Sequence, residues 1–128
     1  MDKLAAVAAG GALGAVARWL LAGAVNRGLP GSFAAGTLVV NVLGCLIIGV
    51  ALALFEGTPR SDRDGLRLLL IVGLLGGFTT WSSFAAETVS LVDTRQAGLA
   101  ALYVLAMNVL SLAAAWCGLA ATRALRGE

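Results

Sequence analysis

Four apolar stretches, each long enough to cross a lipid bilayer, constrain this chain more than any other feature. They cover residues of about 4–25, 33–55, 68–92 and 97–122. A bilayer core of roughly 30 Å requires about 20 mostly apolar residues per helix. Short polar segments separate the stretches at 26–31, 56–64 and 93–96. The pattern predicts an all-α integral membrane protein, a single transmembrane domain of residues 1–128 with four transmembrane helices.

Composition excludes several other classes of protein. Of the 128 residues, 59% are hydrophobic and 12% are charged, and the mean hydropathy is +0.92. A soluble domain of this size leaves too much of its surface in water to hide so many apolar residues. The chain has no histidine and no phosphate-binding or nucleic-acid motif. A histidine-based metal site or general base is therefore excluded, and we predict no nucleic-acid partner. Because the four stretches leave no room for a soluble domain, any functional site should lie within or between the helices.

The third apolar stretch contains an unusual polar segment, GGFTTWSSF, at residues 76–84. Its two glycines, with Gly73 one turn earlier, weaken a helix, and Thr79 and Thr80 can bond to backbone carbonyls. These residues predict a helix broken near its middle. Unwound backbone at membrane depth is tolerated where it is buried in protein or lines a polar cavity. Its free carbonyls suit a cation such as Na⁺, and its free N–H groups suit an anion.

Aromatic and acidic side chains follow this predicted break. Trp81 and Phe84 are three residues apart and share a helix face, with two serines between them. They either line a polar path or fill space at a packing kink. Glu87 lies about two turns beyond Thr80 on a similar face. It is either an interfacial carboxylate or a mobile gate group at a pore mouth.

Ionisable and amide side chains inside the other stretches are costly in a membrane and so are functional candidates. Arg18 follows a small face of Gly10, Gly11 and Gly14 that suits close helix packing. Arg18 either extends to the interface or forms an electropositive vestibule that concentrates anions. Asn41 either joins two helices by hydrogen bonds or lines a polar path and donates its NH₂ to an anion.

Three motifs together resemble the Fluc/CrcB family of fluoride channels. They are GGALGAVARW at 10–19, GTLVVNVLGCLIIG at 36–49 and GLLGGFTTWSSFAAE at 73–87, and the likeness covers essentially the whole chain. The third motif is similar to the family pattern GxxGGxTTFSTFxxE. The resemblance implies a multi-pass protein of the cell membrane that exports fluoride passively and lowers its toxicity in the cytoplasm.

The same resemblance implies an antiparallel dual-topology dimer with two pores and a structural Na⁺ at its centre. By motif position the carbonyls of Gly76 and Thr79 would hold this ion. The fluoride path would be lined by Asn41, Thr80, Trp81, Ser82, Ser83 and Phe84. Arg18 would serve the vestibule, Glu87 is a vestibule or gate candidate, and Tyr103 and Ser111 are further pore candidates. Trp81 and Ser83 replace a phenylalanine and a threonine of the family pattern. We expect these two differences to affect the rate of conduction more than the function itself.

Two other functions are compatible with a small four-helix membrane protein. A drug/proton antiporter would use a carboxylate in its first helix, but Arg18 is the only charged residue between Leu4 and Val25. A non-transporting assembly subunit would use the glycines for packing alone, and the hydroxyl cluster argues against it. We therefore expect a channel.

Charge distribution bears on orientation and partner. One predicted side carries six basic residues, namely Lys3, Arg60, Arg63, Arg67, Arg123 and Arg126, and the other carries Arg27 and Arg95. The positive-inside rule favours both termini in the cytoplasm. A dimer that inserts in both directions needs nearly balanced loops. The partner is thus either a second copy, with the bias overcome, or an oppositely oriented paralogue.

Overall fold

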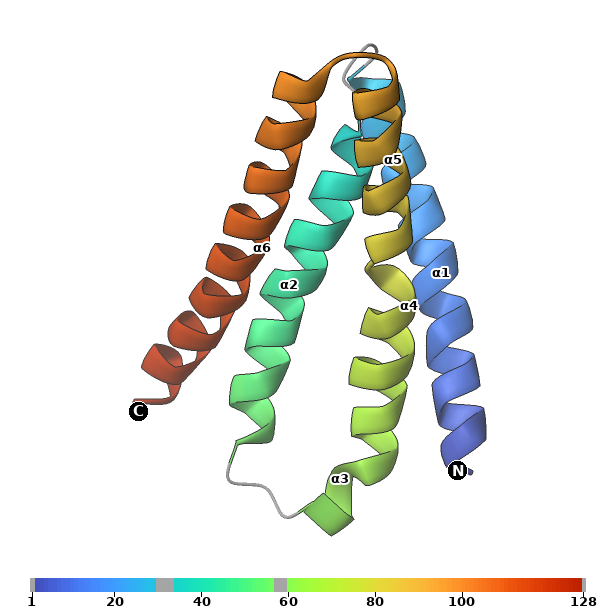
Figure 1. Ribbon diagram of the computed structural model, residues 1–128. Coiled ribbons are helices and arrows are strands. Elements are labelled where there is room, and N and C mark those ends of the chain that lie inside the picture. The colour runs from blue at the N-terminus through green and yellow to red at the C-terminus, as the bar shows by residue number, and fades with distance from the viewer. Residues whose placement is uncertain (1, 30–33, 57–59, 128) are drawn as a thin grey trace.

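The computed structural model describes residues 2–29, 34–56 and 60–127, and its folded elements are helices throughout (Figure 1). In chain order these are α1 (Lys3–Gly28), α2 (Ala35–Phe55), α3 (Arg60–Arg67), the π-helical η1 (Leu68–Leu75), α4 (Gly76–Phe78), α5 (Trp81–Asp93) and α6 (Ala97–Arg126). Within these ranges four helices are long and apolar enough to cross a membrane, the third being the interrupted span Asp64–Asp93. The predicted four-span all-α fold with one broken helix is confirmed.

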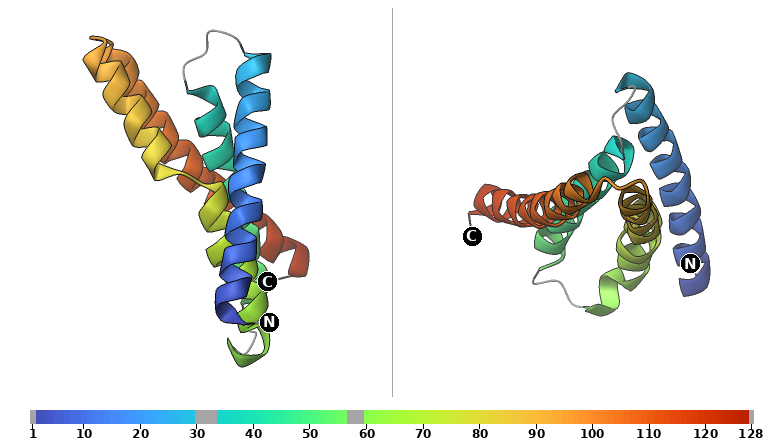
Figure 2. Two further views of the ribbon diagram at one scale, coloured as in Figure 1. Left: turned by 90° about the vertical axis from the view of Figure 1, so that its right-hand side faces the viewer. Right: turned by 45° about the horizontal axis from the view of Figure 1, so that its top comes forward.

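The interrupted span packs against a different helix on each side of its break. α1 lies along η1 and α4, α2 lies along α6, and α5 pairs with α6. Figure 2 shows the α5–α6 pair tilted away from α1 above the break. Both termini and α3 lie at one end of the molecule, and the turn between α5 and α6 lies at the other (Figure 1). The break lies near the middle of the molecule's height, and residues of α1, α2 and α6 line pockets together with Thr80 of the break.

Glycines set the closest helix contacts. A Cβ added to Gly14 of α1 would stand 2.1 Å from the Leu74 carbonyl oxygen, and one added to Gly49 of α2 would stand 2.0 Å from that of Ala115. Gly10 and Gly118 are equally tight. Small residues let helix backbones approach closely where the bilayer supplies no hydrophobic drive for association. The small face predicted for the first helix is thus used against η1 and α4.

The largest differences from the sequence-based expectation are at two helix ends. The fourth helix was expected to end near 122, but α6 runs to Arg126, where Gly127 adopts a left-handed φ of 75° and ends it. The third helix was expected to begin near 68, but helical structure already begins at Arg60 with α3; residues 57–59 lie outside the described ranges. Apolar runs mark where the bilayer ends, whereas the hydrogen-bond ladder can continue into the polar interface.

An ion pair joins the ends of α2 and α6 beside the membrane. Arg123 donates to both carboxylate oxygens of Glu56, with its Nε 2.9 Å from Oε2. The hydrogen bond from Arg123 holds the pKa of Glu56 below its usual value. Arg126 donates to the backbone carbonyl of Ala53. Both arginines stand in the last turn of α6, where cations are favoured by the helix dipole.

Candidate functional site

The third span is interrupted at two threonines. Thr79 (φ −77°, ψ 156°) and Thr80 (φ −147°, ψ 112°) are extended between α4 and α5. The adjacent glycines Gly76 and Gly77 are helical, so the extended residues of the break are the threonines and not the glycines. A Cβ on Gly77 would stand 2.5 Å from the Gly11 carbonyl oxygen, so this glycine is needed for contact with α1. The predicted break is present, and the threonines form it.

Asn41 of α2 replaces the backbone pairing that is lost at the break. Its Oδ1 accepts a hydrogen bond from the Thr80 amide at 2.8 Å, and its Nδ2 donates to the Thr80 carbonyl at 3.0 Å. Both residues are buried. Nδ2 also contacts the Met107 sulfur at 3.5 Å. Of the two interpretations of Asn41, joining helices by hydrogen bonds is therefore observed, while donation to an anion stays a prediction.

Because of the break, two backbone carbonyls lose the amide donors that they would have in a continuous helix. In an unbroken helix the Thr80 amide would pair with the Gly76 carbonyl, and the Ser83 amide with the Thr79 carbonyl. Here Thr80 donates to Asn41, and Ser83 donates to Thr80 Oγ1 at 3.1 Å. Gly76 and Thr79 are the residues whose carbonyls were predicted to hold Na⁺. Both line a pocket of about 230 Å³, so the donor set fits a cation bound by unwound backbone.

A hydroxyl cluster begins α5 on the other side of the break. Thr80 Oγ1 lies 3.2 Å from Ser82 Oγ and 3.0 Å from Ser83 Oγ. Thr80 and Ser83 line a pocket of about 260 Å³ together with Arg18 of α1 and Thr37 of α2. The structure thus brings Arg18 to the hydroxyl cluster, as a polar path requires, while its role in concentrating anions stays a prediction.

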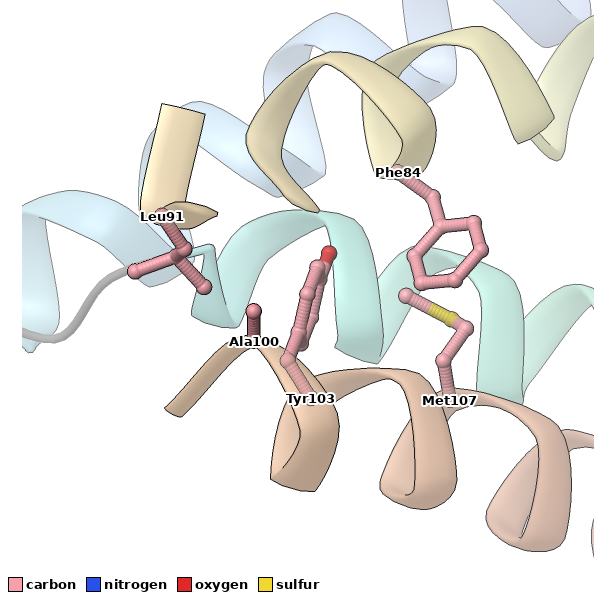
Figure 3. Close-up of a cluster of buried hydrophobic side chains, with 5 residues drawn as sticks. All are labelled: Phe84, Leu91, Ala100, Tyr103 and Met107. Atoms are coloured by element: carbon pink, nitrogen blue, oxygen red, sulfur yellow. The ribbon is translucent and has the colours of Figure 1, made fainter. Parts of the chain in front are cut away.

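The aromatic residues behave differently from one another. The rings of Trp81 and Phe84 are 5.0 Å apart, edge to face at 64°. Phe84 is buried in the cluster between α5 and α6 (Figure 3). Trp81, in contrast, is 72% exposed. Trp81 also lines a pocket of about 270 Å³ with Asn41 and Ser111. Predicted path residues from α2, α5 and α6 therefore meet at this pocket.

Glu87 is held by hydroxyl groups from two other helices. The Thr37 hydroxyl donates to Oε1 at 2.7 Å, and the Tyr103 hydroxyl donates to Oε2 at 2.6 Å. The carboxylate thereby links α2, α5 and α6. Sequence reasoning gave Thr37 no role, although it stands four residues before Asn41 and hence on the same helix face.

Removing the Tyr103 hydroxyl is expected to weaken this link. Tyr103→Phe should lower the free energy of unfolding by about 1–3 kcal/mol, because a buried charge-assisted hydrogen bond is lost. Thermal unfolding in detergent measures the change. In a Glu87→Gln background the same substitution should cost less, and equal losses in the two backgrounds would contradict the coupling.

The arrangement defines a class of protein: a small multi-pass membrane protein with a polar break at the centre of its third span. A family model described as "CrcB-like protein, Camphor Resistance (CrcB)" matches residues 5–119. The chain belongs to this CrcB family.

Curated relatives match the chain over nearly its whole length. A "Fluoride-specific ion channel FluC" of Nitratidesulfovibrio vulgaris is 43% identical over 123 residues, which are 96% of this chain and 98% of the relative. Proteins of the same name from Agrobacterium fabrum and Geobacter sulfurreducens are 44% and 42% identical, each over 98% of this chain and over 99% and 100% of their own lengths.

Proposed function

We propose that this protein is a fluoride-selective channel that passes F⁻ passively across the cell membrane and lowers the fluoride concentration of the cytoplasm. The observation that carries the proposal is the polar break itself, where hydroxyl groups and an aromatic pair gather at mid-membrane. The names of the relatives support the choice of ion. Conduction involves no chemical step, and the protein is accordingly not an enzyme.

The chemistry of the site suits a small, strongly hydrated anion. A pore must replace the water around such an ion with closely placed donors. The hydroxyls of Thr80, Ser82 and Ser83 can each turn an O–H toward an anion. The ring edges of Trp81 and Phe84 carry partial positive charge, and Trp81 adds an indole N–H. Arg18, in the adjoining pocket, would draw anions toward these groups.

We further infer a dimer with a structural Na⁺ at its centre. One chain offers only the two carbonyls of Gly76 and Thr79, which by themselves would leave a cation at this depth with too few oxygen ligands. A second copy, inserted in the opposite direction, would double the carbonyls on offer, and an oppositely oriented paralogue would serve equally. The exposed Trp81 and Asn108 support a covering partner, because a lone chain would present both to lipid. When bound, Na⁺ would lower the cost of an anion in a low-dielectric site.

Efflux from proteoliposomes tests the proposed function. Vesicles that contain the purified protein in Na⁺ buffer should release trapped fluoride, with trapped chloride retained. Thr80→Val should slow fluoride release at least about tenfold, because it removes a central hydroxyl without changing side-chain size. The matched control is Thr88→Val, whose hydroxyl donates only to the Phe84 carbonyl of its own helix.

Three outcomes would go against parts of this proposal. Release of chloride at the rate of fluoride would exclude selectivity. Fluoride movement that requires opposing proton movement would favour an antiporter. No release from folded protein, restored by an opposite-topology paralogue, would replace the homodimer by a heterodimer. Replacing Na⁺ by a large organic cation should slow release if the sodium site is used.

A further inference from the structure

Two side-chain donors from different helices converge on one sulfur atom. The Asn41 side chain has two N–H groups; one donates to the Thr80 carbonyl, and Nδ2 also lies 3.5 Å from Met107 Sδ. The Ser111 hydroxyl lies 4.0 Å from the same sulfur. Met107 is 4% exposed, so water does not compete for this position. The thioether thus occupies the point where these two donors meet.

A thioether is a poor acceptor for such a position. Neutral sulfur accepts hydrogen bonds weakly, whereas bonds to an anion are about twice as strong as neutral ones. Methionine is unbranched and has three rotatable bonds, so it can leave a contact at little cost. The pocket of about 270 Å³ that Met107 lines with Asn41 and Ser111 gives the displaced side chain space to move.

We propose that Met107 is a displaceable occupant of an anion subsite and thereby a specificity-determining residue of the channel. Fluoride would take the place of the sulfur between Asn41 Nδ2 and Ser111 Oγ, and the methionine side chain would swing aside. This inference rests on the proposed function, because it names the residue with which the conducted anion competes.

The surroundings of Met107 explain how it would select for size. Figure 3 shows its side chain reaching from α6 toward the ring of Phe84, in a cluster that includes Tyr103. A small anion needs only the space that the sulfur leaves. A larger anion such as chloride would fill more of the pocket itself, and would leave the displaced side chain only the closely packed space beside Phe84 and Tyr103. The methionine therefore admits fluoride at lower cost than chloride.

Methyl NMR provides a direct test, because the chain contains only two methionines, Met1 and Met107. Full-length protein labelled with [¹³C-methyl]methionine in nanodiscs would be titrated with sodium fluoride, and with sodium chloride at equal ionic strength. We expect a saturable shift of the Met107 resonance with fluoride and none with chloride. The Met1 resonance serves as an internal control, and Met107→Leu assigns the peaks.

Replacing both methionines by norleucine removes the sulfur while keeping the length and flexibility of the side chain. Without an acceptor to displace, the fluoride concentration for half-maximal current should fall about two- to fivefold, in line with the weak hydrogen bonds removed. Ser111→Ala should raise it by a similar factor. Opposite effects of these two changes are not expected from simple loss of packing.

The outcomes separate this inference from the proposed function. If wild-type vesicles conduct fluoride while the Met107 methyl resonance is unaffected, the displacement is wrong and the channel assignment stands. An unchanged half-saturating concentration in the norleucine protein would likewise overturn it. If folded protein conducts no fluoride and its Met107 resonance does not respond, both proposals fail.

Discussion

Replacing Asn41 with leucine is expected to lower the free energy of unfolding by about 2–5 kcal/mol and to abolish fluoride permeability. Leucine has the same branching at Cγ but cannot accept from the Thr80 amide or donate to the Thr80 carbonyl. Each buried backbone group left without a partner costs about 1–3 kcal/mol, and the bilayer provides no water to replace it. The break would then lose the contact that fixes its extended conformation.

Amide hydrogen exchange at Thr80 is the most direct measurement of this effect, with thermal unfolding and fluoride efflux beside it. The matched control is Asn108→Leu. Asn108 lines the same pocket, but it is exposed and its Nδ2 donates only to the Val104 carbonyl of its own helix. Exchange at Thr80 should accelerate in the Asn41 variant and not in the control. Unchanged protection in the Asn41 variant would show that the break is held by other contacts.

The four spans and the break could be predicted because the bilayer imposes them. A helix that crosses it needs an apolar run of fixed length, and residues that disturb a helix at mid-depth need a structural reason. The expected bond from a threonine hydroxyl to a backbone carbonyl is made by Thr79, whose Oγ1 donates to the Leu75 carbonyl at 3.1 Å, whereas Thr80 Oγ1 contacts two serine hydroxyls instead. These inferences require only local sequence and the properties of the solvent.

The position of the break depends on a contact that local sequence does not reveal. Glycines favour unwinding in isolation, yet Gly76 and Gly77 stay helical. The ladder is interrupted where Asn41, 39 residues earlier in the chain, supplies an alternative donor and acceptor to Thr80. Tertiary contact here overrides intrinsic propensity.

Local sequence also does not reveal which side chains contact the predicted polar residues. Glu87 was expected at an interface or as a mobile gate, but hydroxyls of Thr37 and Tyr103 hold it. Met107 gave no polar signal, although it lies four residues after Tyr103 and four before Ser111. Spacing places these three on one helix face, but only the fold shows that Asn41 contacts Met107 and shares a pocket with Ser111.

Gly14→Val is expected to be among the most damaging single changes in the chain. A Cβ at Gly14 would lie 2.1 Å from the Leu74 carbonyl oxygen and 2.8 Å from the Phe78 amide nitrogen. Both are backbone atoms, so α1 must separate from η1 and α4 to admit the side chain. Overpacking of this kind costs about 3 kcal/mol, and thermal unfolding in detergent should show a correspondingly lower midpoint.

Gly11→Val is the matched control, since a Cβ at Gly11 meets nothing within 4 Å. It should leave the unfolding midpoint close to that of the wild type, and similar losses in both variants would contradict the packing argument.

Fluoride efflux should be affected in the same order, with a larger loss in the Gly14 variant than in the Gly11 variant. Phe78 directly precedes the extended pair Thr79–Thr80, so a displaced α1 disturbs the released carbonyls and carries Arg18 away from the hydroxyl cluster. Fluoride efflux should therefore fall in the Gly14 variant even where some protein still folds.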